Sequence, residues 1–211
     1  MDYELLKKEL QLACHERQAC KKGYAELLRS ASVSEIVATG KHNWGDVWGS
    51  MFADIIDEKI ARWYDGLQDE FHLAGMYVNE PTNKGLVIVS HTDQPLHFNG
   101  QAKVYVFGKA KVTAAGRCEV YCRCPDADIE LTGNAWGLIE RGRVVARDFA
   151  TVQSYQEVTC YDSTSVIVNA GVCHDYGHRQ IQLRDNTTIY TNSRYNITYD
   201  TERITTIPIT E

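Results

Sequence analysis

Hydrophobic and polar residues alternate along the second half of the chain, from about residue 86 onwards. The stretch at 101–108, QAKVYVFG, has small or β-branched residues at every second position, and the next two stretches, KAKVTAAG and RCEVYCRC, repeat this spacing. The three stretches place Val104, Val112 and Val120 at the same position. Side chains at alternate positions of a strand face one side of a sheet, so each repeat predicts one short strand with one buried face.

The repeat continues in both directions with steps of six to nine residues, and twelve of about fifteen units carry Val or Ile at the central position. Gly or Asp recurs between the units, where the chain must turn. Short strands repeated without hairpin signals are typical of a solenoid of stacked parallel strands. Two repeats per coil would give a flat roll of two sheets, and three would give a triangular β-helix; the steps leave both open. The central positions are Ile88, Leu96, Val104, Val112, Val120, Ile129, Gly137, Val144, Val152, Val158, Val166, Cys173, Ile181, Ile189 and Ile197.

Residues 1 to about 75 have a helical periodicity instead. Gly23 follows a basic pair and Gly40 follows an apolar stretch, and both predict helix ends. The stretch SVSE at 32–35 has the spacing of a capping box. A further helix is expected at about 50–65. We expect these helices to cover the first coil of the solenoid, because an open end exposes strand edges.

The sequence therefore predicts a mostly β fold, a parallel β-helix or β-solenoid of octad repeats with an α-helical N-terminal cap region. The expected division is a helical region at 1–78, the solenoid at 79–200 and a C-terminal capping tail at 201–211. The octads Ala-x-Val-x-Ala-x-Gly behind a helical segment resemble those of uncharacterised repeat proteins from bacterial genomes and their mobile elements. The resemblance covers about 86–200; it implies the architecture and no particular activity.

The composition is that of a globular protein, with 44% hydrophobic and 24% charged residues. The net charge of -6 argues against a broad surface for nucleic acid or for an anionic membrane. The first residues lack a basic-then-apolar export signal, and no apolar run reaches the roughly 18 residues of a membrane span. We therefore expect a cytoplasmic protein whose seven cysteines are reduced thiols.

One irregular stretch, GVCHDYGH at 171–178, groups residues that could bind zinc or iron or form a His–Asp acid–base pair. The candidates are Cys173, His174, Asp175 and His178. Strand alternation predicts that Cys173 and Asp175 face inward and that His174 and His178 face outward, which opposes a single cluster unless the segment loops out. The alternative is a polar irregularity in the solenoid wall. No cofactor is expected elsewhere.

The other cysteines of the repeat favour packing over metal binding. Cys118, Cys122 and Cys160 occupy positions that Ala or Ser fill in other repeats, and cysteine packs well as a small buried residue. Cys124 falls at a turn position. We expect Cys124 to be exposed, and it is the candidate reactive thiol.

The stretch HNWGDVWGSMF at 42–52 is rich in large aromatic residues, which are favoured anchors at protein interfaces. Together with a later tryptophan it supplies four candidate binding residues, Trp44, Trp48, Phe52 and Trp63. The same side chains are equally suited to seal the helical cap against the first coil.

A carbohydrate-cleaving β-helix is a further alternative, because such an enzyme would place paired carboxylates on an outer face. Outward charges on a solenoid can also form a merely solvated face. Phosphate-binding, hydrolase and metalloprotease motifs are missing from the sequence. The candidate acids are Glu119, Asp128, Glu130, Glu140 and Glu157.

These observations favour a non-enzymatic binding or assembly protein that binds a protein partner through its wall or cap, or that self-associates through its ends or flat faces. For a chain from a mobile element, the resemblance implies a host protein as the partner. An enzyme with a metal or acid–base centre at 173–178, or with outer-face carboxylates, remains the alternative class. Membrane and nucleic-acid partners are not expected.

Overall fold

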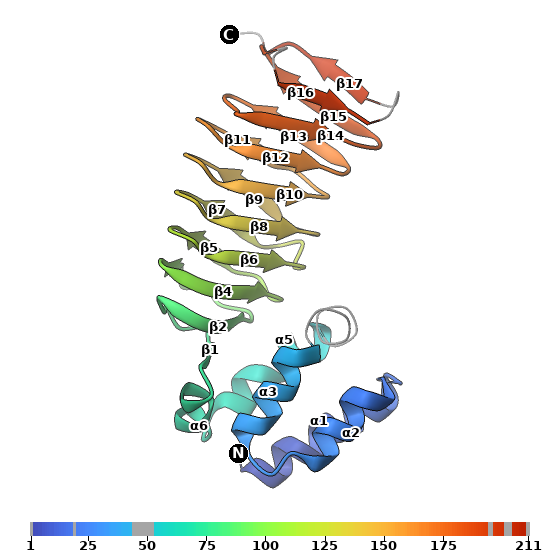
Figure 1. The fold of residues 1–211 in the computed structure, drawn as a ribbon, viewed down its shortest axis with the longest axis vertical. Coiled ribbons are helices and arrows are strands. Elements are labelled where there is room, and N and C mark those ends of the chain that lie inside the picture. Colours follow the sequence, from blue (N-terminus) through green and yellow to red (C-terminus); the bar gives the residue numbers. More distant parts are fainter. Residues whose placement is uncertain (1, 19, 44–52, 194–195, 201–203, 210–211) are drawn as a thin grey trace.

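The computed structural model is a β-solenoid of two parallel sheets that stands on a layer of helices (Figure 1). This arrangement confirms the predicted mostly β solenoid behind an N-terminal helical region. The structure describes residues 2–18, 20–43, 53–193, 196–200 and 204–209.

Five helices precede the solenoid within the described residues. Gly23 and Gly40 lie inside helices, so the helix ends predicted at these glycines are wrong. The helix that contains Gly23 continues because Leu27, further along it, is buried in the helical core. None of the helices in the described part of the chain is both long enough and apolar enough to cross a membrane. The helices are α1 (Tyr3–Glu16), α2 (Lys21–Arg29), α3 (Val33–Asn43), α5 (Ala53–Tyr64) and α6 (Gln68–Leu73).

Each coil contributes one strand to each of two sheets, so the solenoid is the flat two-sided roll. Val104 pairs with Val120, and Val112 pairs with Ile129, so two repeats complete one turn. In order, sheet A contains β1 (Met76–Val78), β2 (Lys84–Val89), β4 (Gln101–Val106), β6 (Glu119–Cys122), β8 (Trp136–Ile139), β10 (Thr151–Ser154), β12 (Ser165–Val168), β14 (Gln180–Leu183) and β16 (Ile197–Tyr199). Sheet B contains β3 (Leu96–Phe98), β5 (Lys111–Ala114), β7 (Asp128–Leu131), β9 (Arg143–Ala146), β11 (Val158–Cys160), β13 (Gly171–Asp175), β15 (Thr187–Thr191) and β17 (Ile204–Ile207).

The central positions of the repeat face the space between the two sheets, with one exception near the start. Val87 pairs with Val104, whereas Ile88 pairs with Tyr105 on the outer face of sheet A. The predicted position of Ile88 in the repeat is therefore wrong by one residue, because the step from Val87 to Leu96 is nine residues long. Ile88 is nevertheless fully buried, since the helices pack over this part of the sheet.

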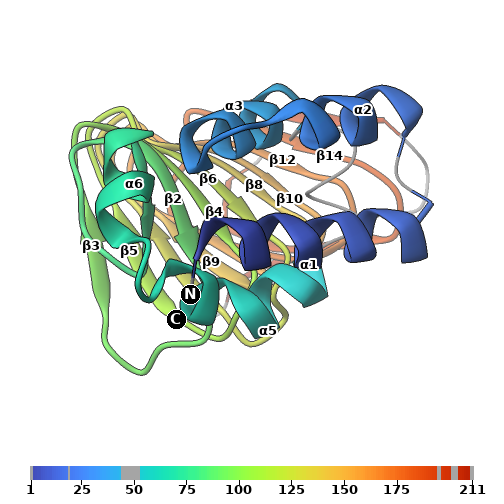
Figure 2. The same cartoon turned by 90° about the horizontal axis from the view of Figure 1, so that it is seen from below.

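The helical layer lies across the end of the first coil, as expected (Figure 2). A second hydrophobic core joins Leu6, Leu10 and Trp63 of the helices to Ile88 and Phe107 of the solenoid. The division of the chain differs slightly from the expected one. Sheet A already begins with β1, before residue 79, and β17 continues sheet B beyond residue 200.

The turns that follow the sheet B strands stack into a column along one edge of the solenoid. The backbone N–H groups of Asn134, Phe149 and Ser163 each donate to a carbonyl oxygen in the preceding turn, at 2.9–3.0 Å. This stacking confirms the expected turn positions and connects successive coils outside the strands. We call this the turn column and define it by Gly100, Gly116, Gly133, Asp148, Asp162 and Gly177.

Left-handed backbone conformations allow these turns to stack closely. Gly116 has a φ of +69°, and a Cβ atom at this position would lie 2.9 Å from the backbone nitrogen of Gly100. Asp148 and Asp162 also have positive φ, at +57° each. The backbone N–H of Gly133 donates to the Asp148 carboxylate at 2.9 Å, so the side chain that replaces glycine ties the coil to its neighbour.

We predict that Gly116→Ala lowers the free energy of unfolding by about 1–3 kcal/mol, because the new Cβ strains the backbone and contacts the preceding turn. Gly23→Ala in α2 is the matched control and should leave stability unchanged or raise it, since alanine is the better helix former. Denaturant unfolding monitored by circular dichroism measures both variants. Equal stability of Gly116→Ala and the native chain would contradict the stacked turn column.

Candidate functional site

The predicted metal-binding candidates lie on different sides of the solenoid wall. Cys173 is fully buried between the sheets, whereas the His174 ring lies on the outer face and stacks on Tyr190 at a centroid distance of 5.0 Å. Both orientations are those predicted from strand alternation. Within the described residues, no group of three or more His, Cys, Asp or Glu side chains is placed to hold a metal ion. The hypothesis of one four-residue metal cluster is therefore not supported.

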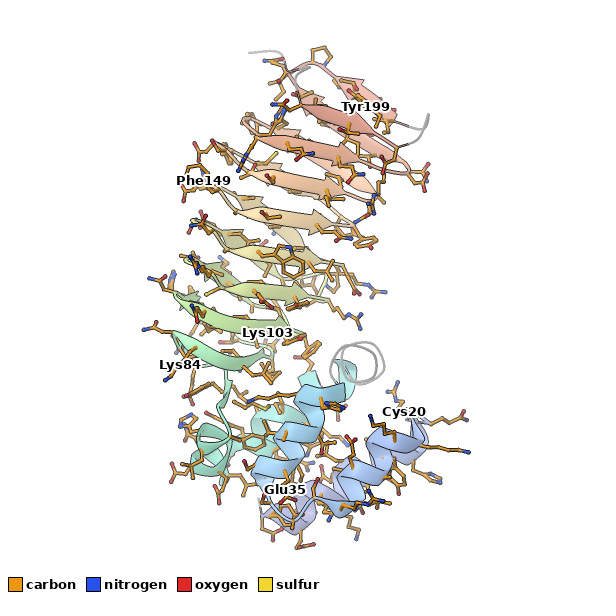
Figure 3. The ribbon with its side chains drawn as sticks, viewed as in Figure 1. Cys20, Glu35, Lys84, Lys103, Phe149 and Tyr199 are labelled. Atoms are coloured by element: carbon orange, nitrogen blue, oxygen red, sulfur yellow. The ribbon has the colours of Figure 1, made fainter. Side chains whose placement is uncertain are left out.

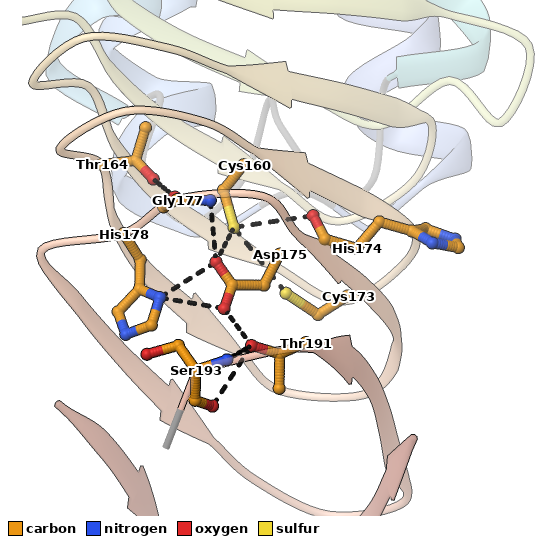
Figure 4. A network of polar contacts seen from close by, with 9 residues as sticks. All are labelled: Cys160, Thr164, Cys173, His174, Asp175, Gly177, His178, Thr191 and Ser193. Carbon is orange, nitrogen blue, oxygen red and sulfur yellow. Dashed lines mark hydrogen bonds and ion pairs between the residues drawn. The ribbon is translucent and has the colours of Figure 1, made fainter. Parts of the chain in front are cut away.

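His178 faces inward, which corrects the outward orientation predicted for it. Its side chain is only 4% exposed, and its Nδ1 atom lies 2.9 Å from the Asp175 carboxylate (Figure 4). His178 follows the turn at Gly177, and strand alternation does not extend through a turn. The stretch therefore produces a buried His–Asp pair and not a larger cluster.

Asp175 is the centre of the polar network drawn in Figure 4. Its carboxylate accepts hydrogen bonds from the backbone N–H of Gly177 at 3.2 Å and from the Thr191 hydroxyl, in addition to its contact with His178. The Cys160 thiol also donates to it, at 3.7 Å. A buried carboxylate is stable only with such partners, so Asp175 joins β11, β15 and the turn after β13.

Two buried thiols lie beside this network. The sulfur atoms of Cys160 and Cys173 are 4.0 Å apart. The hydrogen bond to Cys173, followed by burial and the nearby Asp175 charge, raises the pKa of the Cys160 thiol far above its usual range. Cys160 therefore remains protonated and serves as a hydrogen-bond donor.

Cys124 is buried, so its predicted role as an exposed reactive thiol is wrong. It is 7% exposed and belongs to the solenoid core, and burial raises the pKa of its thiol. The step from Val120 to Ile129 is nine residues, and Cys124 packs inward before the turn that contains the extra residue. Among the described cysteines, Cys20 at the start of α2 is the exposed one.

Four of the five outward acids form ion pairs with basic residues in an adjacent coil. The nitrogen–oxygen distances lie between 2.7 and 3.7 Å. Glu157, the fifth acid, lines a groove of about 600 Å³ on sheet B together with Asp128 and Glu130. The arrangement links coils electrostatically, and it resembles a structural face more than a pair of carboxylates around a substrate bond. The pairs are Glu119 with Lys103, Asp128 with Arg143, Glu130 with Arg147 and Glu140 with Arg123.

Of the four aromatic anchors predicted in the helical half, Trp63 lies within the described residues. Trp44, Trp48 and Phe52 lie outside the described residues. Trp63 is buried, and its indole N–H donates to the Glu9 carboxylate at 2.7 Å. Trp63 therefore seals the helical core and presents no surface to a partner.

A different set of aromatic side chains projects from the turns after the sheet B strands. Phe149 is 62% exposed and Tyr176 is 58% exposed, and Figure 3 shows Phe149 at the edge of the solenoid. The Tyr161 and Tyr176 rings stack at a centroid distance of 5.2 Å, and the Arg147 guanidinium lies 4.3 Å from the Tyr161 centroid. We call Arg147, Phe149, Tyr161 and Tyr176 the aromatic edge.

A cavity of about 710 Å³ adjoins the aromatic edge. Tyr176 lines it together with Asp162, Asn192 and Ile209, and the Asp175–His178 pair forms part of its wall. Apart from the Asp175–His178 pair, the residues of this site were not predicted from the sequence. A usable signal was present, since Phe149 and Tyr176 place large aromatic residues at turns where water-exposed residues are usual.

No protein-family model, no curated protein and no solved structure matches this chain. The case for a function therefore rests on the geometry of the chain itself.

We predict that a thiol reagent at mildly alkaline pH labels Cys20 of the native protein quickly and the buried cysteines only on unfolding. Burial raises the pKa of Cys14 to about 11 and that of Cys122 to about 12, so both stay unreactive thiols. Mass spectrometry of labelled peptides, with Cys20→Ser and Cys124→Ser as matched variants, measures this. Fast labelling that disappears only in Cys124→Ser would restore the original hypothesis.

We predict that His178→Ala lowers the free energy of unfolding by about 1–3 kcal/mol, because it leaves a buried carboxylate with one partner fewer. His174→Ala removes only an outer stacking contact and should cost less than about 1 kcal/mol. Thermal unfolding with and without added zinc measures both effects. If zinc raised the Tm of the native chain but not of His178→Ala, the metal hypothesis would regain support.

Proposed function

We propose that the protein is a non-enzymatic binding protein whose aromatic edge contacts a protein partner. The observation that carries the proposal is the exposure of Phe149 and Tyr176, at 62% and 58%, together with a cavity of about 710 Å³ that Tyr176 lines. Exposed aromatic side chains next to a pocket are common features of protein interfaces, where tyrosine and arginine often contribute most of the binding free energy.

Contacts with neighbouring residues hold Arg147, Tyr161 and Tyr176 of the aromatic edge in place before any partner binds. Arg147 lies between the Tyr161 ring and the Glu130 carboxylate, whose oxygen is 3.0 Å from its Nε atom. Tyr161 in turn stacks on Tyr176. Little conformational freedom remains to be lost on binding, which favours affinity.

Charge around the aromatic edge indicates what the partner surface contains. Asp148 and Asp162 of the turn column are exposed and adjoin Phe149 and Tyr161 in the sequence. Complementarity then favours a partner with apolar side chains at the centre of its surface and Lys or Arg around them. The cavity beside Tyr176 would accept one of the partner's side chains.

The acid–base alternative has weaker support. The Asp175 carboxylate accepts hydrogen bonds from Gly177, Thr191 and Cys160 in addition to its contact with His178. Such a saturated carboxylate is typical of a structural hub, although an oriented histidine at a cavity wall is also what an acid–base centre would use.

We predict that the double variant Phe149→Ala, Tyr176→Ala loses a protein that co-purifies with the native chain from cells of the source organism. Loss of two aromatic anchors should weaken binding by at least about 30-fold. Quantitative mass spectrometry of the co-purified material measures the stoichiometry.

The matched control is Tyr155→Ala, which removes a partly exposed tyrosine from a turn after a sheet A strand. It should retain the partner. A partner that the double variant still holds at native stoichiometry would contradict a binding role for the aromatic edge.

A further inference from the structure

The groove of about 600 Å³ on the outer face of sheet B has no role in the proposed function so far. It lies over β5, β7, β9 and β11, and each of these strands has a neighbouring strand on both sides. The groove is therefore a surface of the middle coils, away from both ends of the solenoid. Its lining includes the short side chains of Thr113, Val145 and Thr159. Its volume is typical of a binding pocket.

A row of charged side chains crosses the groove from coil to coil. Lys111 pairs in register with Asp128, and Asp128 pairs with Arg143. Glu157 occupies the same position in the next coil, because the residue after it, Val158, pairs with the residue after Arg143. All four charged residues line the groove. The row thus carries alternating positive and negative charges over four successive coils.

The two inner members of this row neutralise each other, and the two outer members do not. A nitrogen of Arg143 lies 2.7 Å from a carboxylate oxygen of Asp128. Within the part of the chain that the structure describes, the exposed side chains of Lys111 and Glu157 have no ion-pair partner. Three strand spacings separate these two residues, which is about 14 Å. The groove therefore presents a positive charge at one end and a negative charge at the other.

We propose that this groove binds an extended peptide segment that has one basic and one acidic residue four positions apart. The basic residue pairs with Glu157 and the acidic residue pairs with Lys111, since four steps of an extended chain span about 13 Å. The residue midway between them faces the same way and lies over the short side chains of the groove. Nucleic acids and acidic polysaccharides carry charges of one sign, and the carboxylates in the groove repel them.

The groove and the aromatic edge share one residue, because Arg147 lines the groove and also lies against the Tyr161 ring. The inference rests on the proposed function to this extent: the extended segment belongs to the partner that contacts the aromatic edge. Its own test uses synthetic peptides and no partner. A failure there leaves the co-purification test of the aromatic edge unaffected.

Three capped pentapeptides that differ only in their terminal side chains test the charge pattern on the full chain. The changes in amide chemical shifts at Thr113, Val145 and Thr159 during NMR titration measure binding. The mixed peptide should bind about fivefold more tightly than either like-charged peptide, because ion pairs at an exposed surface are individually weak, and the difference should shrink in high salt. The peptides are Lys-Thr-Val-Thr-Glu, Lys-Thr-Val-Thr-Lys and Glu-Thr-Val-Thr-Glu.

Charge reversal at either end of the row should change which peptide is preferred. Lys111→Glu should prefer the peptide with two lysines, and Glu157→Lys should prefer the peptide with two glutamates. The second variant keeps the test intact if the first fails to fold. Lys109→Glu is the matched control, because it makes the same change at an exposed residue that does not line the groove. It should keep the native preference.

Four results would overturn the proposal. The native chain could bind none of the peptides, or all three equally. It could bind polygalacturonate, an acidic polysaccharide, more tightly than the mixed peptide. The folded charge-reversal variants could keep the native preference.

Discussion

Each coil of the solenoid is buried only by the coils on either side, and the rest of the structure depends on this mutual burial. Val104 pairs with Val120, and Val152 pairs with Val166, so the branched side chains form continuous rows between the sheets. Such rows require that every coil rise by one strand spacing. The turns must then stack as closely as the strands, which explains the glycine and left-handed aspartate residues of the turn column.

The same constraint determines where a binding function can lie. Inward positions are occupied by the core, and many outward positions on the strands carry cross-coil ion pairs such as Arg147 with Glu130. Large side chains are most exposed at the turns, where Phe149 and Tyr176 project and Tyr176 lines a cavity. The interior of the repeat thus provides rigidity, and its turns carry the surface that we propose for a protein partner.

The sequence predicted the parts of the structure that follow directly from periodicity. It correctly placed most central positions, the turns and the helical cover of the first coil. The predictions for Ile88 and Cys124 were wrong because each lies in a nine-residue step between repeats. The extra residue shifts the alternation of inward and outward positions by one. The prediction for His178 was wrong because a turn intervenes between that residue and its strand.

The number of sheets and the aromatic edge required three-dimensional information. The irregular steps hid whether two or three repeats complete a coil, and the strand register answers this question. Arg147, Tyr161 and Tyr176 belong to three successive coils, so only the stacking of the coils brings them together. The buried partners of Asp175 likewise come from three separate strands or turns, a network that no local motif encodes.

The central claim is that the aromatic edge is a surface for another protein. Site-specific photo-crosslinking inside cells of the source organism tests it most directly, with a photoreactive phenylalanine analogue in place of Tyr176 or, as the comparison, of Tyr155. We predict one discrete protein adduct from position 176 and none from position 155. Equal adducts from both positions, or an adduct from position 155 alone, would contradict it.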